Sequence, residues 1–164
     1  LETFAIARMF EEVLAAANLR LGPMTRGRFR LMREIEGRGN ASRGLAIVVE
    51  DSYTGRPRPT SSLSGGERFM AALALALGLS DVVESTQGGI RLDAIFIDEG
   101  FGSLDSENDA GTLDQVLQTL VDMAGKGRAI GLISHVPLVQ QSVPNGFWIT
   151  STASGSWIQE RVTV

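Results

Sequence analysis

The sequence predicts a mixed α/β fold, with a mainly parallel sheet, crossover helices and a β-hairpin near each end of the chain. Strand-like and helix-like apolar patterns alternate through residues 67–133, which favours parallel strands connected by helices. Two further pairs of strand-like segments flank this part, each around a glycine-containing turn. The 164 residues, 43% of them apolar, suffice for one domain with a genuine core.

The composition excludes several classes of protein. With 21% charged residues the chain matches ordinary globular proteins, so a disordered or collagen-like chain is excluded. The absence of cysteine rules out a disulfide scaffold, thiol catalysis and thiolate metal sites. We expect no membrane helix, because no apolar run approaches the roughly 18 residues that one needs. The first residue is Leu1 rather than Met, which indicates a piece of a longer chain.

The N-terminal part predicts a helix followed by a hairpin. Apolar side chains recur at helical spacing through residues 2–19, and Gly22 and Pro23 mark the expected end of that helix. Residues 28–36 and 44–53 are expected to pair as strands around a turn at residues 37–40. The stretch 54–62, rich in proline and glycine, is expected to be a loop.

The remaining elements alternate between helix and strand. We expect an apolar helix from Glu67 to Leu79, a second helical stretch through residues 81–85, and a strand at residues 94–97. A helix over residues 106–124 ends at Gly125, and a strand over residues 128–133 precedes a short helix beginning at Pro137. Residues 147–152 and 156–162 form the expected C-terminal hairpin.

Charge is unevenly distributed, although the net charge is −4. Residues 1–60 carry ten arginines against seven acidic residues, whereas residues 61–164 carry five basic residues against twelve acidic ones. Arginine suits bidentate phosphate contacts, so the basic half indicates either a nucleic-acid surface or an ordinary solvated one. The candidates lie in or beside the N-terminal hairpin: Arg20, Arg26, Arg28, Arg30, Arg33, Arg38 and Arg43.

The segment from Leu63 to Glu67 is the first candidate site. Ser64 and Glu67 stand three residues apart at the start of a helix, the spacing of a capping box, which can be purely structural. Gly65 and Gly66 are costly in a first helical turn, at about 1 kcal/mol each. That cost is explained if a ligand approaches the backbone closely. Bare amides, a helix N-terminus and a serine hydroxyl together favour phosphate binding.

Two further candidates follow apolar strands. Asp98 and Glu99 directly follow the strand 94–97. One carboxylate there can hold Mg²⁺, and the next can take a proton from water. The alternative is that both are simply a solvated strand end. His135 follows the strand 128–133 and is expected at the same sheet edge, although a lone histidine is often structural. The run Gly100 to Asp105 is either a functional loop or a turn before the next helix.

In order and spacing, these four segments resemble the signature motif, Walker B motif, D-loop and switch histidine of ABC-type ATPases. The run from Asp98 to Asp105, and the loop Tyr53 to Arg56 that leads into the signature segment, are similar to the SbcC family of SMC-like ATPases. The resemblance covers nearly the whole chain and implies a single domain, 1–164: the C-terminal lobe of an ATPase head. Residues 1–22 would stand at the base of a coiled coil, and residues 28–164 would form the ATPase lobe.

The resemblance also implies a role for each site residue. Ser64, Gly65 and Gly66 would contact the γ-phosphate of ATP held by the opposite head, with Glu67 completing that motif. Asp98 would position Mg²⁺ and Glu99 would be the general base. Asp105 would lie at the seam between the two heads, and His135 would sense the γ-phosphate.

One element of such an ATPase is missing from the sequence. A P-loop needs Gly-x-x-x-x-Gly-Lys-Ser/Thr, and the sole lysine, Lys126, is followed by Gly127. In the SbcC family the P-loop lies in the N-terminal lobe, so we expect that lobe as a partner and expect this chain alone to be inactive. The resemblance further implies a second head, an SbcD-type nuclease, double-stranded DNA and a cytoplasmic, nucleoid-associated location.

Two alternatives stay open. One is another protein of the same class, either an ABC transporter nucleotide-binding domain or the head of another SMC-like protein. A transporter domain would carry its P-loop upstream in one compact chain. The other is a non-catalytic dimerisation or DNA-binding module, against which the intact Ser64, Glu99 and His135 argue.

Overall fold

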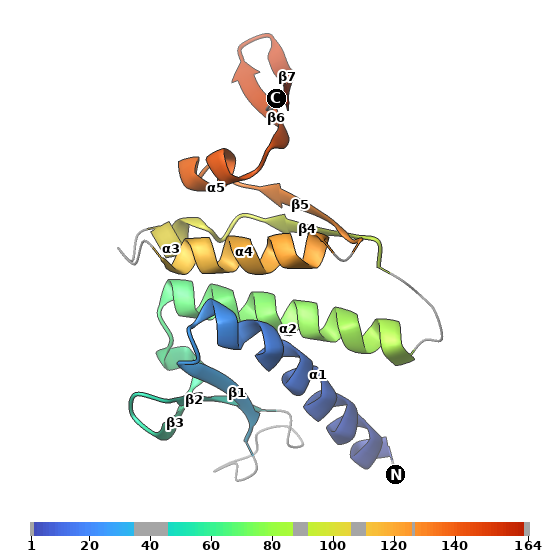
Figure 1. Ribbon diagram of the computed structural model, residues 1–164, viewed down its shortest axis with the longest axis vertical. Coiled ribbons are helices and arrows are strands. Elements are labelled where there is room, and N and C mark those ends of the chain that lie inside the picture. Colours follow the sequence, from blue (N-terminus) through green and yellow to red (C-terminus); the bar gives the residue numbers. More distant parts are fainter. Residues whose placement is uncertain (1, 35–45, 87–91, 106–110, 126, 163–164) are drawn as a thin grey trace.

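Three small sheets and five α-helices make up the part of the chain that the computed structural model describes, residues 2–34, 46–86, 92–105, 111–125 and 127–162 (Figure 1). The mixed α/β class is confirmed. The strands form an antiparallel sheet of order β1-β2-β3, a parallel pair β4-β5 and an antiparallel hairpin β6-β7. The parallel arrangement, expected to predominate, is thus found in one of these three sheets.

The first two helices lie against each other. α1 (Glu2–Met24) crosses α2 (Gly65–Thr86), and a Cβ added at Gly78 would stand 2.6 Å from the Ala17 nitrogen. Glycine therefore lets the two backbones approach closely. α1 runs past its expected end because Pro23 falls in its last turn, where a missing N–H removes a single hydrogen bond. α2 is one continuous helix, rather than a helix with a second stretch after Leu79.

The N-terminal sheet is larger than expected. β1 (Phe29–Arg33) and β2 (Ile47–Asp51) form the predicted antiparallel pair, and β3 (Arg56–Pro59) adds a third strand where a loop was expected. A 3-10 turn, η2 (Thr60–Ser62), then leads into α2. Pro57 and Pro59 are tolerated because β3 pairs with β2 alone and so lies at the sheet edge. The turn predicted at residues 37–40 lies outside the described residues.

A strand–helix–strand unit forms the middle of the molecule. β4 (Ala94–Asp98) and β5 (Ala129–Ile133) are parallel, with Asp98 opposite Ile133, and α3 (Gly102–Asp105) and α4 (Thr112–Ala124) connect them. The prediction of parallel strands with a crossover helix is confirmed here. Residues 106–110, expected to begin that helix, lie outside the described part. Because the strands are parallel, their carboxyl ends meet at one edge.

The core lies between the helices. α1 packs against α2 and also contacts α4, and buried side chains of all three helices join one apolar cluster with β1 and β2. Among the described helices, α2 is the one long and apolar enough to span a membrane. Its buried residues pack inside the protein, among them Met70, Leu73, Ala74 and Leu77, so its hydrophobicity is that of a core helix.

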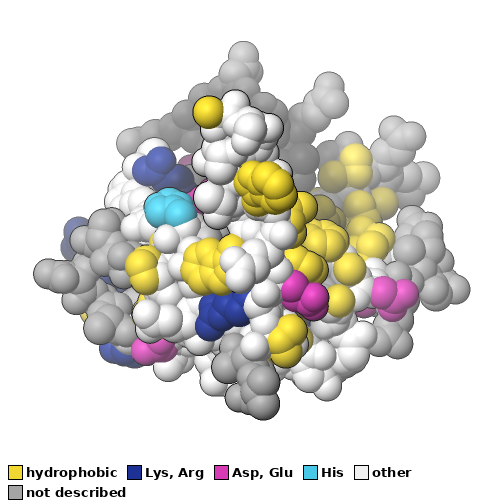
Figure 2. All heavy atoms as spheres, turned by 90° about the horizontal axis from the view of Figure 1, so that it is seen from above, with side chains coloured by type: hydrophobic (Ala, Val, Ile, Leu, Met, Phe, Trp, Pro, Cys, Tyr) yellow, Lys and Arg dark blue, Asp and Glu magenta, His cyan; other side chains and the backbone are white. Residues whose placement is uncertain are grey.

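The C-terminal elements project from this body (Figure 1). α5 (Pro137–Ser142) leads into β6 (Asn145–Thr152) and β7 (Gly155–Val162), the predicted hairpin. Apolar side chains are exposed on both of its faces, with Phe147 and Ile149 on one and Trp157 on the other. Figure 2 looks onto this end of the molecule and shows hydrophobic side chains gathered there.

Candidate nucleotide site

The turn that opens α2 is a complete capping box, as predicted. The Ser64 amide donates to Oε2 of Glu67 at 2.9 Å, and the Glu67 amide donates to Oγ of Ser64 at 3.2 Å. The helix begins at Gly65, so Ser64 stands at its N-terminus with a half-buried side chain. The bond from Glu67 uses a lone pair of the serine oxygen and leaves its hydrogen free to donate to a further acceptor.

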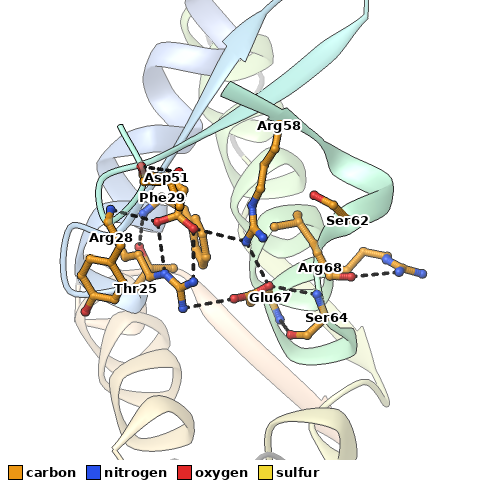
Figure 3. A network of polar contacts seen from close by, with 12 residues as sticks. Thr25, Arg28, Phe29, Asp51, Arg58, Ser62, Ser64, Glu67 and Arg68 are labelled. Carbon is orange, nitrogen blue, oxygen red and sulfur yellow. Dashed lines mark hydrogen bonds and ion pairs between the residues drawn. The ribbon is translucent and has the colours of Figure 1, made fainter. Parts of the chain in front are cut away.

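Two arginines hold the Glu67 carboxylate, a feature that the capping-box spacing does not predict (Figure 3). Its Oε1 lies 3.3 Å from Nη1 of Arg28, and its Oε2 lies 3.4 Å from Nη2 of Arg58. Both arginines also contact Asp51, which is 1% exposed. The pKa of the Asp51 carboxyl is held below its ordinary value, chiefly by the hydrogen bond from Arg28. One signal for this network was available: Ile47, Val49 and Asp51 share a strand face, and a buried acid needs a cation.

The carboxylates predicted at the end of β4 are in place. Asp98 is the last residue of the strand, and the Glu99 amide extends the ladder by donating to the Ile133 carbonyl at 2.9 Å. The backbone then turns sharply, with φ of 54° at Glu99 and 97° at Gly100. Both carboxylates are exposed, so they are accessible to a ligand and to water.

His135 lies beside Glu99, which confirms that both residues occupy one edge of the sheet. Nδ1 of the histidine is 2.9 Å from Oε2 of Glu99. The pair results from the parallel register, because Glu99 follows β4 directly and His135 comes two residues after β5. Both side chains remain open to solvent, the histidine at 78% and the glutamate at 48% exposure.

The loop after Glu99 connects this pair to the start of α2. A Cβ added at Gly65 would lie 3.4 Å from the Ser103 Cβ, and one added at Gly102 would lie 3.8 Å from Nε2 of His135. Phe101, fully buried, packs edge-to-face on Phe69 of α2. The four predicted segments therefore lie close together. Asp105 ends α3, and its side chain lies outside what the structure describes.

The donors present are compatible with a magnesium ion shared with phosphate. Among the described residues, no group of three or more His, Asp or Glu side chains could enclose a metal by itself. Mg²⁺ in phosphoryl-transfer sites commonly uses one or two carboxylates, with waters and phosphate oxygens as the other ligands. The exposed Asp98 can supply one such ligand.

Three of the arginines considered for nucleic-acid contact have carboxylate partners within the chain. Arg20 pairs with Asp81, Arg33 with Glu11, and Arg28 with Asp51 and Glu67. Arg26 and Arg30 are exposed, whereas Arg38 and Arg43 lie outside the described residues. The basic excess of the N-terminal half thus serves in part to neutralise internal acids.

Comparison with known proteins agrees with the motif arrangement. Residues 43–118 match the model of the SbcC/RAD50-like Walker B motif family. The chain is 49% identical over 160 residues to the SbcC subunit of the SbcCD nuclease of Vibrio cholerae serotype O1 and 42% identical over 161 residues to that of Treponema pallidum. This chain is an SbcC-like member of the SMC/RAD50 ATPase family. Each alignment takes in 97% of this chain but 15% of the relative's length.

Solved structures support the fold assignment. A chain from a structural study of ATP-driven dimerization and DNA stimulated activation of SMC ATPases matches with a TM-score of 0.70, covering 96% of this chain and 88% of that one, at 14% identity. The SMC head domain from Thermotoga maritima matches with a TM-score of 0.57, covering 99% of this chain and 52% of that one, at 18% identity. The SbcC-like chain therefore shares the fold of SMC heads.

Proposed function

We propose that this SbcC-like chain is the C-terminal lobe of an ATPase head that hydrolyses ATP at the interface of two heads. In this proposal residues 1–164 form a single domain, with residues 1–22 at the base of a coiled coil. The observation that carries the proposal is the 2.9 Å contact between Glu99 and His135 at the carboxyl edge of β4 and β5, where the loop beside it reaches the Ser64 turn.

The proposed chemistry assigns one step to each side chain. Glu99 takes the proton of the attacking water, and its exposed carboxylate is open to that water. His135, next to Glu99, contacts the γ-phosphate. Ser64, Gly65 and Gly66 present a hydroxyl group and a helix N-terminus to the γ-phosphate bound by the opposite head, where positive potential stabilises anionic charge. Asp105 lies at the seam between heads.

The proposal also includes a metal ion. Asp98 would hold Mg²⁺, which, when bound, neutralises charge on the phosphate oxygens during transfer to water. ATP itself needs a P-loop, and the sequence contains none. We therefore infer that an N-terminal lobe of the same protein supplies that loop and that this chain alone does not turn ATP over.

Exposed apolar surface near the site supports a missing partner lobe. Phe96 of β4 is 77% exposed and Ile133 of β5 is 54% exposed, and the projecting hairpin adds Phe147 and Ile149. Large apolar side chains exposed in such numbers are typical of a surface that another protein or lobe covers. We infer that the N-terminal lobe covers it. The length of the relatives leaves room for such a lobe, since this chain corresponds to 15% of them.

The names of the relatives suggest the wider role. They are subunits of a nuclease, SbcCD, so we propose an SbcD-type nuclease as partner and a second head as homodimer partner. ATP binding would close the head dimer and hydrolysis would open it, which would regulate the nuclease on double-stranded DNA. The processes concerned are double-strand break and hairpin processing, repair and recombination, in the cytoplasm at the nucleoid.

Replacement of the proposed base tests this function. In the full-length protein, Glu99→Gln should still bind ATP with Mg²⁺ and dimerise, while turnover falls by about 100-fold or more, in line with the loss of a general base. Turnover is measured by phosphate release and dimerisation by light scattering. Turnover near that of the wild type would refute the assignment of Glu99.

A further inference from the structure

Four charged side chains link the N-terminal sheet to the first turn of α2 (Figure 3). Asp51 accepts from Nε of Arg28 at 3.3 Å and from Nη2 at 3.1 Å, a bidentate pair, and lies 3.5 Å from Nη2 of Arg58. The same two guanidinium groups reach the two oxygens of Glu67, at 3.3 and 3.4 Å. Two cations and two anions thus form one closed, formally neutral cluster.

The surroundings of this cluster hold its geometry. Asp51 is almost fully buried and also accepts from the Tyr53 amide at 3.0 Å. The Arg28 guanidinium lies 4.5 Å from the Phe29 ring and 4.7 Å from the Tyr53 ring. Arg58 buries its Nε without a hydrogen-bond acceptor among the described residues, which costs free energy. The protein tolerates that cost at the position where Nη2 reaches both acids.

The cluster neutralises the Glu67 carboxylate at a position where an unpaired negative charge would repel phosphate. Glu67 lies in the first turn of α2, and a negative charge there counteracts the positive potential of the helix N-terminus. Two guanidinium groups within 3.4 Å of its oxygens cancel that charge. Glu67 can therefore hold the Ser64 amide at 2.9 Å without repelling an anion that approaches the serine hydroxyl.

We propose that Arg28, Asp51 and Arg58 are positioning residues for the phosphate contact of Ser64: they hold Glu67 against the Ser64 amide and neutralise it. This inference rests on the proposed function, in which Ser64 meets the nucleotide of the opposite head. Asp51 acts through the two arginines, and the arginines act through Glu67. The expected defect is in the joining of two heads, because each head binds ATP on its own P-loop.

The test compares two arginines of β3 in the full-length protein. Arg58→Gln should bind ATP within about twofold of the wild type, whereas its ATP-dependent dimerisation should weaken by about tenfold, which corresponds to roughly 1.4 kcal/mol. Its kcat should fall in parallel. Arg56→Gln is the matched control. Arg56 is exposed and lies two residues before Arg58 in the same strand, so this variant removes the same positive charge without touching the cluster. Dimerisation of the control should equal that of the wild type.

A second pair of variants separates charge from folding. Glu67→Gln preserves the capping box, so the double variant Arg58→Gln with Glu67→Gln removes the cation and the charge it cancels together. Dimerisation of the double variant should recover at least threefold over Arg58→Gln. Arg58→Lys keeps the charge and should stay within about threefold of the wild type. Thermal unfolding shows whether each variant is folded. If Arg58→Gln does not fold, Arg58→Lys is used for the test in its place.

The outcomes distinguish this inference from the proposed function. Arg58→Gln dimerising like Arg56→Gln would overturn the positioning role, as would a folded double variant no better than the single one, or a tenfold loss in Arg58→Lys. Glu99→Gln is measured alongside. If neither it nor the wild type dimerises with ATP, the proposed function fails and the positioning role fails with it. If both dimerise, the arginine variants alone decide the inference.

Discussion

At the scale of single residues, the backbone just after β4 decides where Glu99 lies. Glu99 itself adopts a left-handed φ of 54°, which is uncommon for a residue with a side chain and is followed by φ of 97° at Gly100. The turn directs the chain from the strand into the buried Phe101. Strain of this kind is often found at functional sites, and here it coincides with the proposed base.

Replacing Gly100 should therefore be costly. In Gly100→Ala the new Cβ would clash with the Phe69 ring, in a backbone conformation that alanine disfavours. We expect a loss of about 2–4 kcal/mol in the free energy of unfolding, combining strain with overpacking. Gly55→Ala is the control, since Gly55 also has positive φ but has nothing within 4 Å of an added Cβ. Its cost, by denaturant titration, should be about 1–2 kcal/mol; equal costs would contradict the packing argument.

Asp51 gives a prediction for the pH dependence of stability. Its pKa is lowered in the folded protein, chiefly by the hydrogen bond from Arg28, so the unfolded chain takes up a proton first as pH falls. The stabilisation is present above the unfolded pKa of about 4 and is lost as pH drops below it. The gap in unfolding free energy between wild type and Asp51→Asn should narrow from pH 6 to pH 3. A constant gap would show that Asp51 acts by shape alone.

Residue-level prediction from the sequence succeeded where the interaction is local or follows a strand end. The capping box of Ser64 and Glu67 spans three residues, and the proximity of Glu99 to His135 follows from parallel strands. The cluster on Glu67 was missed because Arg28 and Asp51 are separated by 23 residues. Their pairing depends on strand register, and spacing in the sequence does not reveal it.

At the scale of elements, the contact between α1 and α2 depends on Gly78. An added Cβ there would stand 2.6 Å from the Ala17 nitrogen and 2.8 Å from the Val13 carbonyl oxygen, both backbone atoms that cannot rotate away. Gly78→Ala should therefore push the helices apart and cost about 2–3 kcal/mol. In α1, Gly22→Ala is the control. A Cβ added at Gly22 has nothing within 4 Å, so this variant should stabilise the protein by up to about 1 kcal/mol. Thermal unfolding measures both, and a stabilising Gly78→Ala would refute the close approach.

Elements were predicted well where the signal is local. The first helix is expected to end near Gly22 and Pro23, and it ends at Met24. A loop is expected over residues 54–62 because proline is rare in strands, but β3 forms there at the edge of the sheet, where that objection does not hold. Local signals carry no information on the neighbouring strand with which β3 pairs.

At the scale of the whole molecule, half of the proposed active site lies on a largely complete core. The helical core and the N-terminal sheet are packed together, whereas the projecting hairpin exposes large apolar side chains on both faces. The motifs could be predicted from the sequence because each is a contiguous run of residues. The surfaces that need a partner could not be predicted, because the exposure of a side chain depends on the tertiary arrangement. We infer that this arrangement is completed by the N-terminal lobe and then by a second head.

ATP hydrolysis by this chain alone, and then in assembly with an N-terminal lobe that carries the P-loop, tests the central claim most directly. We predict no turnover from the chain alone, because no P-loop is present to hold the phosphates. We predict turnover on assembly, and its loss when Glu99→Gln is used. ATP hydrolysis by the chain alone would contradict a site shared between two lobes. A folded assembly that does not hydrolyse ATP would contradict the ATPase function itself.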